Sequence, residues 1–348
     1  MVRGWRMRVL EVSRYKKTMA GNISPFVLEQ GEAIRDCLNR GLVIGDCKLV
    51  NEPSEVEHFL IKGNYLKAVG ALKRKIREFR PDVVHAHFGL SAITAELQGL
   101  VPVVTTFHNG ETLNWHVNLM SSLMSLRAKH VIYVAQHIRD LSYFKAKNYS
   151  IIPCGVNMEE CEVMDKAEAR QRLGWDAKKK YILFGGAFDN LRKNYPLLRQ
   201  AVERLKDERI RGLEDIEIVE MKGLSRAECV LRMNACDLFA LPSHSEGSPQ
   251  ALKEAMACNC PCLATDIADV KYLFGDEPRH FILRNPRKTH ERWDEDEHSL
   301  DEMVALLKEA LAFEGRTNGR QRILELELSN EQVAKRIITI YNNILNNK

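Results

Sequence analysis

Several features that would assign this chain to a specialised class of protein are scarce in its sequence. No run of residues approaches the roughly 18 consecutive apolar residues that a membrane-spanning helix needs, and the N-terminal MVRGWRMRVL holds no apolar signal region. The nine cysteines are an odd number, scattered through helix-like and strand-like patterns. We therefore expect reduced thiols and a cytoplasmic protein, whose 348 residues suffice for two domains.

Two further absences exclude classes of ligand. Cys258, Cys260 and Cys262 lie close together, but their spacing is wrong for a zinc knuckle and Pro261 stiffens the middle, so no metal is expected there. Nucleic acid is not expected as a partner, because no basic strand interleaved with aromatic residues and no helix-turn-helix pattern is present.

Positive charge is concentrated in the first half of the chain. Residues 1–150 hold 21 Lys and Arg against 13 Asp and Glu, whereas residues 151–348 hold 30 against 34. Part of the excess falls on Lys73, Arg74 and Lys75, in a helical pattern that also carries an apolar stripe. The sequence leaves two interpretations open: this helix contacts anionic lipid at the inner face of the membrane, or its cations are an ordinary solvated face.

The stretch Leu238–Asp269 organises the second half. Its apolar run Leu238–Leu241 predicts a buried strand of a parallel sheet, and Ser248 with Pro249 predicts the start of a helix over Gln250–Ala257, with Ser248 as the N-cap. Past the helix, Asn259 is expected in a left-handed conformation and Cys260–Thr265 in the next strand. The unit is therefore strand, loop, helix, strand.

Two carboxylates lie in this unit, Glu246 in the loop and Glu254 in the second turn of the helix. A helix N-terminus at the carboxyl edge of a parallel strand attracts phosphate, whereas carboxylates accept hydrogen bonds from neutral hydroxyls. Together these groups suit a nucleotide-sugar. The alternative is that Glu254 pairs with a lysine on an exposed helix face.

The segment PSHSEGSPQALKEAMA resembles the donor-binding segment of the retaining family 4 glycosyltransferases. The resemblance implies an α/β protein of the GT-B fold, in which two Rossmann-like domains face each other across a cleft. It also implies a C-terminal helix that crosses back to the first domain. We expect the domains at residues 1–155 and 156–328 and this helix at 329–348, with the junction at SIIPCGVN.

The first half carries three motifs that resemble this family. A strand at Arg8–Ser13 precedes a loop whose single Gly21, with Asn22, stands where the family has glycines near the donor; this is no G-x-G-x-x-G fingerprint. PDVVHAHFG and PVVTTFHNGE are strands that end in histidines. The resemblance implies that His108 reaches toward the transferred sugar, while His85 and His87 form a packing or acceptor-side pair.

In the second half, a predicted strand runs into GGAFDNLRKN. Glycines between a strand and a helix let a phosphate approach the backbone, and Lys193 and Arg192 supply positive charge for the diphosphate. The family commonly has an arginine where this chain has Ala187, and Arg192 is the nearest residue that can replace it. The acidic stretch at 291–297 is expected to be a solvated loop without chemistry.

The resemblance gives each site residue a role. His108 and Glu246 are expected to act on the sugar, Glu254 to hold the ribose, and no metal or cofactor is implied. The donor-binding residues are expected to be Gly21, Asn22, Gly186, Arg192, Lys193, Gly247, Ser248, Gln250 and Glu254.

We therefore expect a retaining hexosyltransferase that uses a UDP- or GDP-sugar and a glycan or lipid-linked glycan acceptor in cell-surface polysaccharide synthesis. Two alternatives stay open within enzymes, a GT-B sugar-nucleotide epimerase and a glucan synthase. A third is a non-catalytic nucleotide-sugar-binding protein, which the missing arginine favours.

Overall fold

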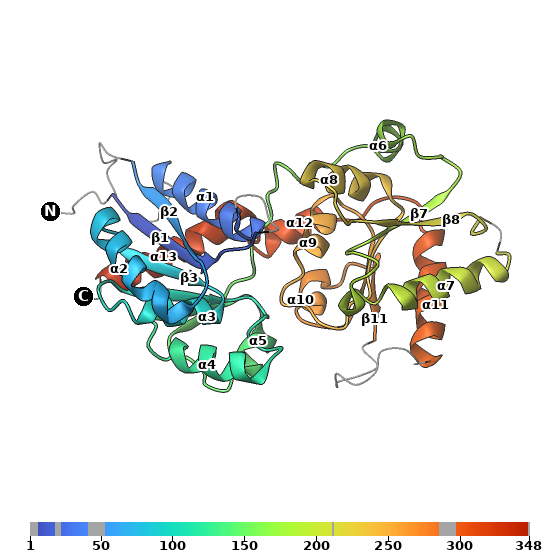
Figure 1. Ribbon diagram of the computed structural model, residues 1–348. Coiled ribbons are helices and arrows are strands. Elements are labelled where there is room, and N and C mark those ends of the chain that lie inside the picture. The colour runs from blue at the N-terminus through green and yellow to red at the C-terminus, as the bar shows by residue number, and fades with distance from the viewer. Residues whose placement is uncertain (1–5, 18–21, 41–52, 211, 285–296, 347–348) are drawn as a thin grey trace. The chain divides into compact units, whose positions relative to one another are not determined.

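The computed structural model describes residues 6–17, 22–40, 53–210, 212–284 and 297–346. The chain divides into two compact units, which we describe separately (Figure 1). Unit 1 comprises residues 1–155 together with 328–348, and unit 2 comprises residues 156–327. The stretch at 285–296, which includes most of the acidic segment expected to be a loop, lies outside the described residues.

Unit 1 is built on a six-stranded parallel sheet in the order β2-β1-β3-β4-β5-β6. The strands are β1 (Arg8–Arg14), β2 (Glu55–Ile61), β3 (Val83–His87), β4 (Val103–Phe107), β5 (His130–Tyr133) and β6 (Tyr149–Ile151). The helices are α1 (Pro25–Asn39), α2 (Tyr65–Phe79), α3 (Gly89–Glu96), α4 (Trp115–Ser125), α5 (Gln136–Leu141) and α13 (Asn330–Asn346).

Alternation along β1 shows how the helices cover the two faces of this sheet. Leu10 and Val12 belong to a buried apolar cluster with residues of α2. Glu11, between them, points to the opposite face, where a Cβ added to Gly31 of α1 would lie 2.8 Å from its carboxylate. Helices α2 and α3 therefore cover one face, and α1 covers the other.

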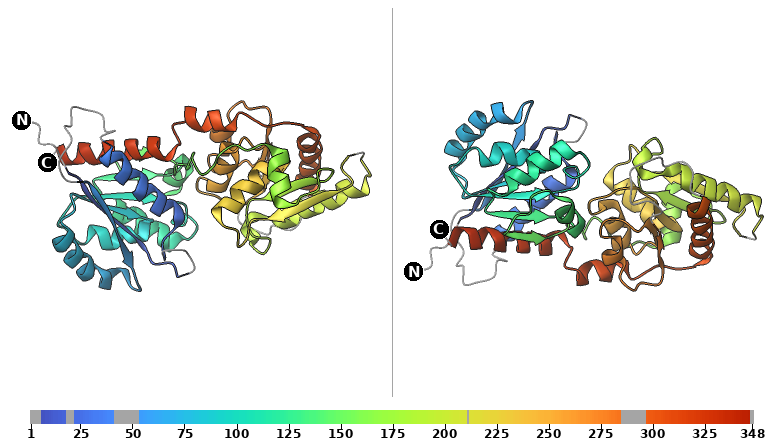
Figure 2. Two further views of the ribbon diagram at one scale, coloured as in Figure 1. Left: turned by 90° about the horizontal axis from the view of Figure 1, so that it is seen from above. Right: turned by 90° about the horizontal axis from the view of Figure 1, so that it is seen from below.

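Helix α13, from the C-terminal end of the chain, packs beside α1 (Figure 2). Its start follows the capping pattern of the sequence, because the Ser329 hydroxyl accepts from the Gln332 N–H at 3.2 Å and the Gln332 side chain accepts from the Ser329 N–H at 3.2 Å. The buried residues Val333, Ile337 and Tyr341 recur at helical spacing on the face that packs on the unit. Among the described helices, none is both long and apolar enough to cross a membrane.

Unit 2 is built on a five-stranded parallel sheet in the order β11-β10-β9-β7-β8. The strands are β7 (Lys180–Phe184), β8 (Ile216–Glu220), β9 (Leu238–Leu241), β10 (Cys262–Thr265) and β11 (His280–Leu283). The helices are α6 (Lys166–Leu173), α7 (Tyr195–Asp207), α8 (Arg226–Ala235), α9 (Gln250–Ala257), α10 (Val270–Phe274), α11 (Glu297–Ala312) and α12 (Gly319–Glu325), with a 3-10 turn, η2, at Leu191–Lys193. Two parallel sheets covered by helices confirm the α/β class.

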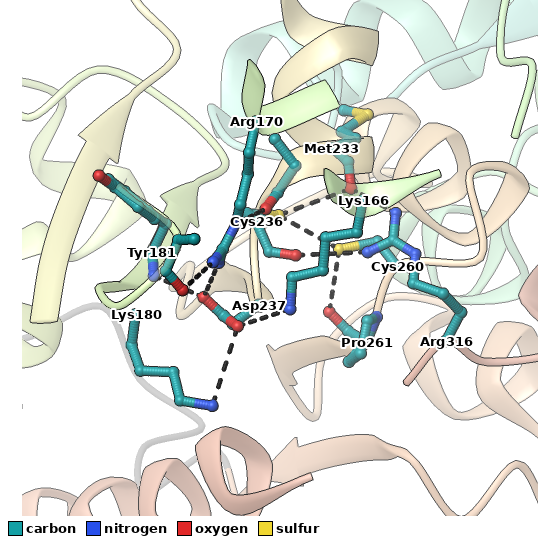
Figure 3. Close-up of polar contacts among 12 residues, drawn as sticks. Lys166, Arg170, Lys180, Tyr181, Met233, Cys236, Asp237, Cys260, Pro261 and Arg316 are labelled. Atoms are coloured by element: carbon teal, nitrogen blue, oxygen red, sulfur yellow. Dashed lines mark hydrogen bonds and ion pairs between the residues drawn. The ribbon is translucent and has the colours of Figure 1, made fainter. Parts of the chain in front are cut away.

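A buried ionic cluster holds the amino end of the central strand β9 (Figure 3). The carboxylate of Asp237 accepts hydrogen bonds from Arg170 Nη2 at 2.7 Å, from Lys166 Nζ at 2.6 Å and from the backbone N–H of Tyr181 at 2.7 Å. Cys236 and Cys260, whose sulfurs lie 3.3 Å apart, are free thiols, as are all cysteines of the described residues. Asp237 thus ties α6 and β7 to β9 at the edge of the sheet opposite the candidate site.

Two details of the Leu238–Asp269 prediction are wrong. Ser248 is not the N-cap of α9; Pro249 holds that position, and the Ser248 hydroxyl instead donates to Asp269 at 2.7 Å. The strand expected from Cys260 begins at Cys262. The predicted Leu238–Leu241 strand, the Gln250–Ala257 helix and the left-handed Asn259 (φ 56°) are confirmed.

Candidate active site

The glycine turn after β7 positions a lysine in unit 2. Gly185 donates its N–H to the Ala240 carbonyl of β9 at 2.9 Å, which keeps the turn against the sheet. A Cβ added to Gly186 would lie only 2.8 Å from Cγ of Lys193, so the Lys193 side chain passes directly over this glycine. Gly186 therefore leaves the space that the Lys193 side chain occupies. Its expected role in binding the donor stays a prediction.

Lys193 forms an ion pair with Glu246. Its Nζ lies 2.7 Å from Oε1 of the glutamate, and the two side chains are 15% and 10% exposed. The backbone supports this pair, because His244 donates its N–H to the Arg192 carbonyl at 2.9 Å and so joins η2 to the loop after β9. Two residues that are 53 positions apart in the sequence thus meet at the carboxyl edge of neighbouring strands.

Ser248 and Asp269 form a second contact beside this pair. Burial raises the pKa of the Asp269 carboxyl, and the negative charge of Glu246 acts in the same direction, while Lys253 and the Ser248 hydroxyl act against it. Gly247 is buried and Gln250 is half-buried in the same loop and helix start. Sequence reasoning missed Asp269, since it lies 21 residues from its partner and in no local pattern.

Glu254 is buried, at 6% exposure, and its Oε1 lies 3.3 Å from Nη1 of Arg226 at the start of α8. Nε of Arg226 lies 3.3 Å from Oε2 of Glu160, so the arginine is shared between two carboxylates. The alternative that Glu254 pairs with a lysine on an exposed helix face is wrong. Its partner is a residue that the sequence offered no reason to select.

His108 follows β4 at the carboxyl edge of the sheet in unit 1. Its Nε2 lies 3.3 Å from Nδ1 of His87, and its Nδ1 lies 3.7 Å from the sulfur of Cys154. The imidazole packs against the rings of Phe26 and Phe88, with centroid separations of 4.9 Å and 4.7 Å. The structure thus places His108 at the end of β4 and joins it to the histidines of β3.

His85 and His87 stack at 4.4 Å between ring centroids, because alternate residues of a strand share a face. Both ring nitrogens of His85 have partners, Tyr341 at 2.6 Å and Thr106 at 2.7 Å. His87 Nε2 lies 3.5 Å from the carboxylate of Glu11 on β1. The pair is therefore part of a buried network that reaches from α13 through β3 to β1.

Glu11 is the charged centre of this network. Burial would raise the pKa of its carboxyl, but the imidazoles of His87 and His58 outweigh burial and lower that pKa to about 2. Sequence reasoning missed Glu11; its signal was a lone carboxylate within the apolar strand RVLEVS.

Within the described part of the chain, one group brings three potential metal ligands together, Glu11, His85 and His87, with ligand atoms within 4.8 Å of one another. Coordination by His85 would require breaking one of its two hydrogen bonds to hydroxyls. His85 is thus held by two hydroxyls, whereas Glu11 meets His58 and His87 as ion pairs at 3.1 Å and 3.5 Å, and neither of its carboxylate oxygens accepts a hydrogen bond within the described residues.

A second missed carboxylate, Glu111, fastens the ends of β3 and β4 to each other. It accepts from the backbone N–H groups of Gly89 at 2.7 Å, Asn109 at 2.9 Å and His108 at 3.2 Å. Burial raises the pKa of Glu111, although these three hydrogen bonds act against it. Glu111 thereby fixes the backbone on which His108 sits.

The loop after β1 carries the two remaining expected residues. Asn22 has a left-handed backbone (φ 61°), and its carbonyl accepts from Lys16 N–H at 2.7 Å. Gly21 lies outside the described residues. The expected donor-binding residues of unit 1 are therefore only partly placed.

Comparison with known proteins identifies the class to which this fold belongs. The family model for Glycosyltransferase Family 4 matches residues 48–160, and the model for Glycosyl transferases group 1 matches residues 179–294. The first match falls almost wholly in unit 1 and the second in unit 2. The chain has the two-domain GT-B fold, and its two units match the models of family 4 and group 1 glycosyltransferases.

Two curated relatives are similar over part of their length. A teichuronic acid biosynthesis glycosyltransferase, TuaC, of Bacillus subtilis (strain 168), whose name is given as putative, is 26% identical over 60% of this chain and 59% of its own length. A D-inositol 3-phosphate glycosyltransferase of Mycobacterium sp. (strain KMS) is 24% identical over 56% of this chain and 54% of its own. The chain thus spans between half and three-fifths of these relatives.

Solved structures are similar over nearly the whole chain. Sucrose-phosphate synthase from Thermosynechococcus elongatus superposes with a TM-score of 0.74 and 17% identity, covering 99% of this chain and 100% of that one. Anabaena HepE in complex with UDP and glucose gives a TM-score of 0.66 and 13% identity, covering 97% and 100%. At these identities the likeness demonstrates the fold.

Proposed function

We propose that this glycosyltransferase moves a sugar, with retention of configuration, from a UDP- or GDP-sugar to a glycan or lipid-linked glycan in cell-surface polysaccharide synthesis. The observation that carries the proposal is the Lys193–Glu246 pair over Gly186 at the carboxyl edge of β7 and β9. An ammonium suits a diphosphate, and a carboxylate beside it suits sugar hydroxyls. The names of the relatives support it, since TuaC is assigned to teichuronic acid biosynthesis and HepE was solved with UDP-glucose.

In the proposed step, the bond between the sugar carbon and the diphosphate oxygen breaks, and the acceptor oxygen bonds to that carbon on the same face. The acceptor proton passes to the departing diphosphate oxygen. Lys193, with Arg192 beside it, would meet the charge that develops on the diphosphate, so the proposal includes no metal. Glu246 would hold sugar hydroxyls, Glu254 the ribose, and His108 the sugar near the reacting carbon.

A panel of UDP-, GDP- and ADP-sugars in thermal unfolding tests donor binding, because a ligand present at about 100 times its Kd stabilises the folded state by roughly 2.7 kcal/mol. We expect a UDP- or GDP-sugar to raise Tm. The shift for nucleoside diphosphate should fall in Lys193→Ala, since the variant loses a charged hydrogen bond of roughly 1.5–3 kcal/mol. Equal losses for diphosphate, nucleoside and free sugar would show instead that the variant disrupts the site.

Catalysis is tested separately from binding, by comparing the rate of donor hydrolysis with that of Glu246→Ala. A protein that binds the donor but hydrolyses it no faster than Glu246→Ala would be a non-catalytic nucleotide-sugar-binding protein. A new sugar nucleotide formed from donor alone would identify an epimerase.

A further inference from the structure

Helix α4 of unit 1, labelled in Figure 1, has an arrangement of polar and apolar residues that is the reverse of that in an ordinary surface helix. Its buried residues are small and polar: Asn118, Ser121, Ser122 and Ser125. Apart from His116, its exposed side chains are large and apolar, including Trp115 at 59%, Met120 at 42% and Leu123 at 40% exposure. The helix WHVNLMSSLMS contains no Lys, Arg, Asp or Glu, although the solvent face of such a helix is normally charged.

Close packing against α3 explains the buried face. A Cβ added to Gly89 would lie 2.3 Å from the Cβ of Ser121, so the helices meet where only small residues fit. The hydroxyls of Ser122 and Ser125 each donate a hydrogen bond of 2.7 Å to a backbone carbonyl of α4. Nothing in this packing requires the outer face to be apolar, so that face needs a separate explanation.

Asn118 extends the apolar face to a second segment. Its Nδ2 donates to the Leu141 carbonyl at 2.8 Å, and its Oδ1 accepts from the Tyr143 N–H at 3.3 Å. The segment it holds carries Leu141 at 58%, Tyr143 at 59% and Phe144 at 39% exposure. We call the exposed residues of α4 and of this segment, 141–144, the α4 surface. Seven large apolar side chains of these two segments are exposed by 36% or more: Trp115, Leu119, Met120, Leu123, Leu141, Tyr143 and Phe144. Exposed apolar residues elsewhere on protein surfaces are usually scattered singly.

The charge around the α4 surface indicates what covers it. Residues 113–149 contain five Lys and Arg but a single Asp or Glu, and Arg127, Lys129, Lys145 and Lys147 are exposed. An apolar group with Trp and Tyr, in a segment whose charged residues are almost all positive, matches the interface of an anionic bilayer. A second copy of the chain would bring the same positive charge and be repelled.

The cations expected from the sequence to contact lipid, on α2, lack this apolar group. Leu72, Ile76 and Phe79 of α2 are buried, and Leu66 in its first turn is the large apolar residue of this helix that is exposed, at 62%. Lys75 forms an ion pair with Glu57. Lys73 and Arg74 therefore offer charge without the insertion that stable binding of a helix to a bilayer requires.

We propose that the α4 surface binds the interface of an anionic bilayer. The inference deepens the proposed function, because a lipid-linked acceptor is found in a bilayer. It rests on the proposed function for the purpose of bilayer binding and not for the binding itself. Bilayer binding is measured without donor or acceptor, so its failure and the failure of sugar transfer are separate results.

The test is sedimentation of the full chain with vesicles of phosphatidylglycerol and phosphatidylcholine, and with phosphatidylcholine alone. We expect binding to the anionic vesicles at low salt and release at about 1 M salt, where the Debye length is about 3 Å. Leu119→Ser with Leu123→Ser should lower the partition coefficient about tenfold or more, since both leucines would leave water on binding. Lys145→Gln with Lys147→Gln should weaken binding to anionic vesicles only.

Two matched controls come from α2. Leu66→Ser removes a leucine that is 62% exposed but lies outside the α4 surface, and Lys73→Gln with Arg74→Gln removes cations without apolar neighbours. Both should bind as the unchanged chain does, with the same Tm. The proposal is overturned if the unchanged chain ignores anionic vesicles at low salt, if the α2 variants lose as much binding, or if light scattering shows a dimer that the leucine variant dissociates.

Discussion

The carboxyl edges of the two sheets hold buried polar groups in opposite ways. In unit 1, imidazoles and carboxylates are bound to the protein itself: His85 to two hydroxyls and Glu111 to three backbone N–H groups. In unit 2, Lys193 with Glu246 and Arg226 with Glu254 are pairs of opposite charge. A ligand that carries both an anion and hydroxyls can replace each partner of such a pair.

This difference predicts which variants change the stability of the fold and which change the affinity for a ligand. Removing a partner from a satisfied buried network leaves an uncompensated group and destabilises the fold. Removing a partner from a pair that a ligand opens changes affinity, because the pair is broken in the bound state anyway. Variants of Glu11, His85 and Glu111 in unit 1 should therefore act mainly on stability, and variants of the two ion pairs in unit 2 mainly on binding.

The largest effect is expected for Glu11→Gln. The pKa of Glu11 is lowered from 4.5 to about 2, a difference worth roughly 3 kcal/mol of stability. Because the folded pKa is depressed, this stability is present above about pH 4.5 and is lost as the pH falls toward 2. Glu11→Gln should lose it at neutral pH and flatten the acid dependence of unit 1.

Hydrogen exchange measured on β1 and β7 peptides tests this prediction, with β7 of unit 2 as the internal control. His58 provides a second check: burial lowers its pKa, but the Glu11 carboxylate, 3.1 Å from its Nδ1, raises the pKa by more, so the net shift is upward. Its contribution is present at acid pH and lost as the pH rises through its folded pKa. Unchanged β1 protection in Glu11→Gln at neutral pH would contradict the assignment of Glu11 as the centre of the network.

Much of the fold followed from local patterns in the sequence. The helix at Gln250–Ala257 and the strand at Leu238–Leu241 were predicted with their observed bounds, because a proline marks one end of each. The prediction of a left-handed Asn259 succeeded because an asparagine just past a helix end tolerates that conformation.

The site was less predictable, because its partners come from distant positions. Ser248 has the sequence of an N-cap, but Asp269 offers a buried carboxylate that its hydroxyl bonds instead. The ribose-binding role of Glu254 stays a prediction, and its partner Arg226 comes from a helix whose pairing no local pattern gives. Likewise, Glu11 is a lone carboxylate within the apolar strand RVLEVS. Only the fold shows that His58 and His87 lie beside it.

A smaller effect is expected for Glu254→Gln. If Glu254 holds the ribose, the variant loses a charged acceptor and the Kd of the donor should rise by the equivalent of roughly 1.5–3 kcal/mol, measured by calorimetry. Arg226→Gln is the matched control, since it removes the other member of the pair and leaves the carboxylate for the ligand. Equal loss of Tm in both variants, with unchanged donor Kd, would mean that Glu254 serves only to hold Arg226.

The smallest effect is expected for Glu246→Gln. This variant distinguishes most clearly between a carboxylate that a ligand displaces and one that supports the fold. In the free protein Lys193 donates to Glu246 at 2.7 Å, so a nucleoside diphosphate must share this ammonium and approach a carboxylate. Removing that negative charge should tighten UDP or GDP binding by roughly 1 kcal/mol. The matching nucleotide-sugar should gain less or bind more weakly, because its sugar hydroxyls lose a charged acceptor. Calorimetry with both ligands measures the ratio of the two Kd values, which should shift toward the free diphosphate. Parallel weakening of both ligands would show that Glu246 supports the loop after β9, and the edge of unit 2 would then resemble that of unit 1.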